Sequence, residues 1–363
     1  MPIISSSPTT LTVAQGSALL GAAAAMGPNS FVVFQQPSLS ARGAHPASGR
    51  VADVTEDGAG FVGHTAIDWA GKGCYDPVTR RVMWASCGAG NNQGGGKVFN
   101  VHPIYSEATN AWSATRNFQA DGETTTNGIG HMYDSNCIHV TGRRFYKKKF
   151  DSGDRKILVF NLDTNAWSTC ISSPPDEAYG SGDGAMEVVP TRGPAGAIWL
   201  VSLANQSNLP KLWEYSIASQ SWSTLIDTGS FGAPRTNTPV MSFNPRAFGG
   251  AGGVLVGTGA GAWTVRADTL SIASVGSPPS TLSMPSDGHL CRDPVGSGWL
   301  YASDSGSLYR CDGTTWTQRA RLPDQLGASG NGQPLVVVPI DAYGVVWIIA
   351  AQGSANRAWL YKP

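Results

Sequence analysis

Hydrophobic positions in this chain fall into short unbroken runs, separated by clusters of Gly, Pro, Asn, Asp and Ser. Examples are "RVMWASCG" (81–88), "AIWLVSL" (197–203), "GWLYASD" (298–304) and "VVWIIAAQG" (345–353). Runs of this length between turn residues are typical of β-strands covered on both faces. The 45 glycines and 23 prolines provide many tight turns. The pattern predicts an all-β protein.

One hairpin pattern recurs along the chain. An aromatic or β-branched residue is followed seven positions later by Trp or Ile, in the pairs Tyr105/Trp112, Phe160/Trp167, Tyr215/Trp222, Val265/Ile272 and Tyr309/Trp316. Successive copies lie 55, 55, 50 and 44 residues apart. A period of this length indicates a propeller or a solenoid. We expect the repeated Trp to be largely buried between repeats.

A second series has the same period. An Asp or Asn ends a strand in "CYDP" (74–77), "MYDS" (132–135), "SFNP" (242–245), "CRDP" (291–294) and "PIDA" (339–342), with "VVPT" (188–191) at the remaining place. An apolar run follows each, which in the second repeat is "NCIHVTG" (136–142). Each repeat therefore predicts four antiparallel strands, with the Asp-terminated strand innermost.

The number of repeats indicates how the ring closes. Six inner strands are present, but the last third strand, "RAWLY" (357–361), is followed by only two residues. An open edge there would invite aggregation, so an upstream strand must fill the place. "GRVADV" (49–54) is the best candidate. We predict a six-bladed β-propeller of four-stranded antiparallel blades over residues 49–363, closed by an N-terminal strand, with an N-terminal arm over residues 1–48.

The order "YDP…W…Y…TNAW" resembles the kelch-type β-propellers, including the central domain of the galactose-oxidase superfamily, over residues 49–363. The double glycine of kelch second strands survives here only as "CGAG" (87–90) and "GTGAG" (257–261). The hairpins are also similar to those of propellers in bacteriophage tail and capsid proteins. These resemblances imply the fold, but propellers carry many different functions.

The chain has few residues in patterns suited to catalysis or metal binding. A copper site of the galactose-oxidase kind would need several His and Tyr at the centre, whereas only His131 and His289 lie near inner-strand starts. Two imidazoles without a third ligand make a weak metal site. "CDGTTW" (311–316) differs from a sialidase Asp-box because its Asp and Gly are adjacent. We therefore expect no catalytic residues, no metal and no cofactor.

Charge is scarce and unevenly placed. Charged residues make up 14% of the chain and the net charge is zero, which gives no case for nucleic-acid or membrane binding. The six cysteines have no zinc-like spacing, and we expect free, buried thiols.

The segment "GRRFYKKKFDSGDRK" (142–156), called the basic segment below, holds seven of the 25 basic residues. We interpret it as a projecting hairpin inserted in the second blade. Its candidate partner-binding residues are Arg143, Arg144, Phe145, Tyr146, Lys147, Lys148, Lys149, Arg155 and Lys156. Side chains alternate across a strand, so we expect the three consecutive lysines not to be buried together and their replacement by Ser to leave folding intact. The alternative is a solvated edge whose lysines prevent aggregation.

The arm is the second departure from the repeat. It has no charged side chain before Arg42, and its middle is too apolar for an ordinary disordered tail. "GSALLGAAAAMG" (16–27) favours a short helix and "SFVVFQQ" (30–36) a strand. The arm either folds back over its own propeller or docks on a neighbouring subunit. "ALLGAAAAM" (18–26) is too short to span a bilayer and lacks signal-peptide flanks, so we expect synthesis in a cytoplasm without export.

The leading hypothesis is a non-enzymatic structural or adhesive component of a large assembly, most simply a bacteriophage virion protein from the tail or capsid. It would be oligomeric in that setting and would contact other structural proteins through the arm and the basic segment. The alternative is a secreted or surface carbohydrate-binding or carbohydrate-active propeller, for which a glycan would be the partner. An intracellular kelch adaptor is a third possibility, but the companion domains of such adaptors are missing.

Overall fold

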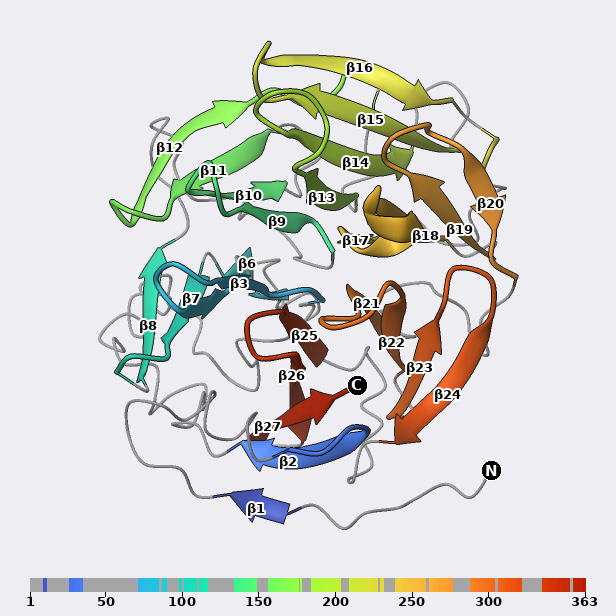
Figure 1. The fold of residues 1–363 in the computed structure, drawn as a ribbon. Coiled ribbons are helices and arrows are strands. Elements are labelled where there is room, and N and C mark those ends of the chain that lie inside the picture. The colour runs from blue at the N-terminus through green and yellow to red at the C-terminus, as the bar shows by residue number, and fades with distance from the viewer. Residues whose placement is uncertain are drawn as a thin grey trace.

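The computed structural model shows six β-sheets arranged as a closed ring, whose central axis we call the channel (Figure 1). It describes residues 9–11, 26–34, 71–84, 87–89, 98–99, 101–109, 111–116, 134–148, 156–175, 177, 184–203, 209–227, 229–231, 239–258, 261–276, 288–303, 306–321, 335–352 and 355–363. The inner strands neighbour one another in chain order, and the last neighbours the first. The predicted fold, a six-bladed β-propeller with four antiparallel strands per blade, is confirmed.

The strands of the first three blades follow one another from the channel outward. Blade 1 holds β3 (Cys74–Asp76), β4 (Arg81–Met83), β7 (Val101–Ser106) and β8 (Ala111–Arg116). Blade 2 holds β9 (Asn136–His139), β10 (Arg144–Lys148), β11 (Ile157–Asn161) and β12 (Ala166–Ile171). Blade 3 holds β13 (Ala185–Val189), β14 (Ala197–Leu203), β15 (Pro210–Ser216) and β16 (Ser221–Ile226).

The second half of the ring repeats this order. Blade 4 holds β17 (Val240–Asn244), β18 (Gly253–Thr258), β19 (Gly261–Arg266) and β20 (Ile272–Ser274), with a 3₁₀ turn at Ala247–Gly250. Blade 5 holds β21 (Gly288–Arg292), β22 (Trp299–Ser303), β23 (Ser307–Cys311) and β24 (Trp316–Arg321). Blade 6 holds β25 (Leu335–Ile340), β26 (Val345–Gln352) and β27 (Ala355–Lys362). A separate pair, β5 (Cys87–Ala89) and β6 (Val98–Phe99), adjoins blade 1.

The ring closes through a strand from the N-terminal region, as predicted, but the expected strand is the wrong one. β2 (Ser30–Phe34) pairs antiparallel with β27, from Ser30 opposite Lys362 to Val33 opposite Trp359. β1 (Thr9–Leu11) then pairs in parallel with β2. Residues 49–54 lie outside the described part of the chain. The apolar, β-branched run of β2 suits a strand that is paired on both sides better than the Asp-containing "GRVADV" does. Residues 30–34, which we assigned to the arm, are therefore a strand of the protein's own sixth blade.

The expected register of blade 2 is also wrong by one strand. "NCIH" is the inner strand β9, and "RFYKK" is the second strand β10 rather than part of an inserted hairpin. The turn before the second strand explains the shift. Arg80 and Arg143 both have left-handed backbone angles, with φ of 54° and 52°, immediately before β4 and β10. This shared turn shape, and not the position of an Asp, aligns the two blades.

The repeated hairpin has the expected geometry in four blades. The two residues seven positions apart that define this hairpin lie directly opposite each other in blades 1 to 4. Examples are Phe160 opposite Trp167 and Tyr215 opposite Trp222. In blade 5 the tighter "DGTT" turn places Trp316 opposite Cys311 instead. Trp167 and Trp222 are half-buried, so the expectation of largely buried rings is wrong for them. They lie on outer strands, and the Trp167 ring packs against His102 of blade 1 and Phe160 of its own blade.

The tightest packing lies on the second and third strands. The fully buried Trp residues are Trp84, Trp199, Trp213, Trp299, Trp347 and Trp359. Five cysteines of the described chain are free thiols, and only Cys170 of them is half-buried rather than buried, in line with the expectation. No helix within the described ranges has the length and apolar character needed to cross a membrane.

Candidate functional site

The basic segment does not project from the propeller where the structure describes it. Phe145, Tyr146, Lys147 and Lys148 of β10 are all buried, with 4% exposure or less. Arg143, Arg144 and Lys156 are half-buried, whereas Lys149 and Arg155 lie outside the described residues. The expectation that neighbouring lysines could not be buried together is therefore wrong. It failed because both faces of this strand are covered, and each lysine finds a polar partner.

One partner directly precedes the inner strand of blade 2, and the other lies in the connection between blades 2 and 3. Lys147 donates through Nζ to the Ser135 hydroxyl, with an N–O distance of 2.5 Å. Lys148 forms an ion pair of 3.1 Å with Glu177, which follows blade 2. The same Glu177 oxygen accepts a hydrogen bond of 2.6 Å from Ser202 on β14. The lysine thus joins blade 2 to blade 3, which is a structural role.

We expect Lys148→Ser to destabilise the fold, contrary to the expectation from sequence. It would leave the Glu177 carboxylate buried without its cation, and breaking one side of a buried ion pair costs about 3–5 kcal/mol. Chemical denaturation should measure this loss. Arg144→Gln is the matched control, because Arg144 is half-buried and, among the described residues, donates to the carbonyls of Gly142 and Arg143 alone. Equal midpoints for the two variants would contradict the structural role of Lys148.

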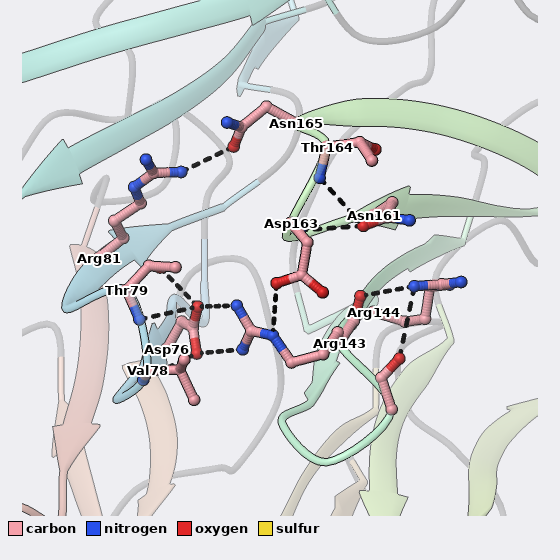
Figure 2. A network of polar contacts seen from close by, with 11 residues as sticks. Asp76, Val78, Thr79, Arg81, Arg143, Arg144, Asn161, Asp163, Thr164 and Asn165 are labelled. Atoms are coloured by element: carbon pink, nitrogen blue, oxygen red, sulfur yellow. Dashed lines mark hydrogen bonds and ion pairs between the residues drawn. The ribbon is translucent and has the colours of Figure 1, made fainter.

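Arg143 joins blade 2 to blade 1 (Figure 2). Its guanidinium donates two parallel bonds of 2.7 and 2.9 Å to the buried Asp76 carboxylate, and a third of 2.8 Å to Asp163. Asp76 also accepts from the backbone amides of Val78 and Thr79, which shapes the turn after β3. Burial alone would raise the pKa of Asp76, but the bonds from Arg143 and Thr79 outweigh it and lower the pKa. The paired geometry is the strongest form of such a contact.

The seam between blades 6 and 1, where the ring closes, has an equivalent contact. The buried Glu107 carboxylate accepts hydrogen bonds from Tyr343 at 2.8 Å and from Tyr75 at 3.2 Å, and Arg80 forms an ion pair with it. Burial, together with the bonds to Tyr343 and Glu107, raises the pKa of Tyr75, so the hydroxyl stays protonated and donates.

The remaining seams are joined in the same manner. The contacts are Arg192 to the Ala267 carbonyl (blades 3 and 4), Asn244 to the Gly298 carbonyl (blades 4 and 5), and Arg292 to Asp341 (blades 5 and 6). Each of the six seams therefore has at least one polar contact between blades. In a chain with few charges, a large share of them is used to hold the ring together.

Lys72 lies at the centre of the channel and connects three blades. Its ammonium group pairs with Asp134 at 3.2 Å and Glu187 at 3.1 Å, and donates 2.7 Å to the Met186 carbonyl and 3.3 Å to the Met241 carbonyl. We call Lys72, Asp134 and Glu187 the hub triad. It is a buried ion cluster that joins different blades.

The hub triad has two carboxylates for one ammonium. Burial would lower the pKa of Lys72, but Asp134 and Glu187 reverse this and raise it, so the ammonium stays charged. Burial raises the pKa of Asp134 to about 7, only partly offset by Lys72. The sequence did not predict a role for Lys72, because this residue belongs to no recognisable motif and its partners come from other blades.

A cavity of about 270 Å³ opens above the hub triad, at the channel end where inner strands turn into second strands. We call it the mouth cavity. Its walls include Tyr75, Phe243 and the prolines Pro77, Pro190, Pro245 and Pro339, and its polar residues include His139, Glu187 and Arg292. A second cavity of about 600 Å³, the seam cavity, lies beside it and is lined by Arg144, Tyr146 and Ile217. His139, Thr141 and Pro190 line both.

The histidines do not gather at a metal site in the described part of the chain. No group of three or more His, Cys, Asp and Glu side chains is placed to hold an ion among those residues. His289 is buried on β21, and His131 lies outside the described residues. His102 on β7 is fully buried, and neither ring nitrogen has a hydrogen-bond partner among the residues that the structure describes. It packs against Phe145, Phe160 and Trp167, with ring centroids 4.5 to 5.3 Å away.

We expect His102→Phe to stabilise the protein. A buried polar group without partners costs about 1–3 kcal/mol, and Phe would extend the existing aromatic cluster. Burial lowers the pKa of His102 from 6.5 to about 3. Between these pH values the imidazole is therefore protonated in the unfolded chain but neutral in the folded chain. The native protein therefore loses stability as pH falls from 6.5 towards 3. Denaturation at pH 8 and pH 5 should show a larger gain at pH 5, and an equal gain would contradict the burial of a neutral imidazole.

Comparisons with known proteins find similar solved structures but no family for this chain. No protein-family model matches the chain, and no curated protein matches it. A solved structure of a nidogen/laminin complex is similar at 11% identity and a TM-score of 0.47, covering 75% of this chain and 85% of that one. TolB from Acinetobacter baumannii is similar at 10% identity and a TM-score of 0.44, covering 87% of this chain and 68% of that one.

Proposed function

We propose that this protein is a non-enzymatic structural or adhesive component of a large assembly, a bacteriophage virion being the setting that fits best, with a propeller of the kelch type. The observation that carries the proposal is that polar and charged side chains form contacts between blades. Every seam of the ring has a polar contact, and the Lys72 ammonium is surrounded by four partners. Polar groups arranged in this way stabilise a rigid body rather than activate a substrate.

Fewer residues of the basic segment are available for partner binding than the sequence indicated. Lys147 and Lys148 are buried in the protein's own blades, so they are not available to a partner. Arg143 is engaged by Asp76 and Asp163. Arg144, which lines the seam cavity, is the residue of the basic segment best placed for contact. Other structural proteins of the assembly remain the proposed partners.

Co-sedimentation tests the proposed setting. Particles released from a culture of the source organism would be separated on a density gradient and probed with antibodies raised against the purified chain. We expect the protein in the particle fractions, at a constant ratio to the major capsid protein. Recovery only from the soluble fractions at the top of the gradient would contradict the virion assignment. The neighbouring genes give an independent check, because capsid and tail genes support it.

A second candidate is a secreted or surface carbohydrate-binding propeller. The mouth cavity supports it, because apolar walls with a few converging polar groups are typical of small-ligand sites. Sugar-utilisation genes beside this one, in place of capsid and tail genes, would favour this candidate over the first.

A further inference from the structure

We propose that the mouth cavity binds the terminal acidic sugar of a glycan, a uronic acid, with its carboxylate on Arg292. This inference deepens the adhesive part of the proposed function and rests on it. The argument begins with groups in the cavity that have unused hydrogen-bonding capacity.

Arg292 has such capacity. Its Nε donates 2.9 Å to Asp341, and no described residue accepts a bond from its two terminal nitrogens. Its side chain is 28% exposed, and it lines the cavity. Asp341 also pairs with Arg246 at 3.2 Å. Two guanidinium groups thus share one carboxylate at this wall of the cavity, and the second carboxylate in the lining, Glu187, is paired with Lys72. A carboxylate is the group that a guanidinium fork binds best.

Acceptors lie in the same cavity. Glu187 uses one oxygen on Lys72, and its second oxygen has no partner within the described ranges. His139 lines both cavities and has no hydrogen-bond partner among the described residues. Burial lowers the pKa of His139, so its imidazole is neutral at pH 7 and offers one donor and one acceptor. Hydroxyl groups both donate and accept, and they match this mixture.

The walls and the floor limit the shape of the ligand. Four prolines, with Tyr75 and Phe243, present apolar surface that suits the C–H faces of a sugar ring. The volume of about 270 Å³ is near the lower end of ligand pockets, so it suits one ring. Lys72, the buried cation of the hub triad, lines the floor of the cavity, which favours the end of a glycan over a chain passing through. The seam cavity, with Arg144, would take the next residue of the glycan.

Calorimetry on the purified full chain tests the inference with galacturonic acid, digalacturonic acid and galactose as probes. We expect both acids to bind, the disaccharide more tightly, and galactose to bind at least about tenfold more weakly because it has no carboxylate. Arg292→Gln should weaken binding of the acids by about tenfold or more. Arg246→Gln is the matched control, because it also breaks one ion pair with Asp341 but does not line the cavity, and it should bind normally.

A third variant covers the case in which Arg292→Gln does not fold. Thr141 is exposed at the rim of both cavities, so Thr141→Trp should block them without disturbing any ion pair. Binding of the acids that survives this change would overturn the inference. Equal affinity for galactose, equal losses in the two arginine variants, or binding of polyglutamate in place of the acidic sugars would overturn it as well. If no uronate binds while the protein still co-sediments with particles, only this inference fails.

Discussion

A chain that begins at Gly49 should melt well below the full-length protein and should aggregate as it unfolds. It lacks β2, so β27 would keep an unpaired edge next to the buried Trp359, Leu360 and Tyr361. The lost ladder bonds contribute about 0.5–1.5 kcal/mol each, and four residue pairs are lost together. An exposed strand edge of this kind is also a template for aggregation. Thermal unfolding followed by light scattering should show both effects.

A chain that begins at Met26 is the control for this truncation. It removes β1 but keeps β2 and its pairing with β27. We expect its melting temperature to stay much closer to that of the full chain, because the sixth blade retains four strands. Equal melting temperatures for the chains beginning at Met26 and at Gly49 would show that β2 does not close the ring.

Replacement of Lys72 by Met should be among the most destabilising single changes in the protein. The variant would leave Asp134 and Glu187 facing each other in the channel without a cation. Removing one partner from such a buried cluster costs about 3–5 kcal/mol. The loss should grow above pH 7, because Asp134 of the wild type has a pKa of about 7 and ionises there beside Lys72, whereas in the variant no cation offsets the burial of the ionised carboxylate. Urea denaturation at pH 6 and pH 8 should measure both the loss and its pH dependence.

The neutral triple variant separates lost charge pairing from lost packing. Lys72→Met combined with Asp134→Asn and Glu187→Gln removes the whole ion cluster while keeping the side-chain volumes similar. We expect it to recover at least half of the stability that Lys72→Met loses, since replacing a complete buried cluster is often neutral. Arg81→Gln, at an exposed contact with Asn165, should cost little and serves as the surface control. A triple variant as unstable as Lys72→Met would show that packing, not charge, gives Lys72 its importance.

The sequence by itself determined the features that repeat locally. The seven-residue spacing predicted the repeated hairpins, because residues on the two arms of a short hairpin are close in the chain, and the structure places Phe160 directly opposite Trp167. The count of inner strands predicted six blades, and the missing last strand predicted closure from the N-terminal side. These statements depend on short-range pairing and on strand number, which a single sequence reveals.

Only the tertiary structure decided which residues meet across the ring. Lys72 bonds to the carbonyl of Met241, 169 residues away, and no spacing in the sequence indicates such a contact. Lys148 looks like a surface lysine until a neighbouring blade places Glu177 beside it. The sequence allowed either "SFVVF" or "GRVADV" as the closing strand. The structure shows that "SFVVF" pairs with the edge of β27. Contacts between blades join positions that are distant in the chain, and their free energy depends on burial and charge that arise only after the ring has closed.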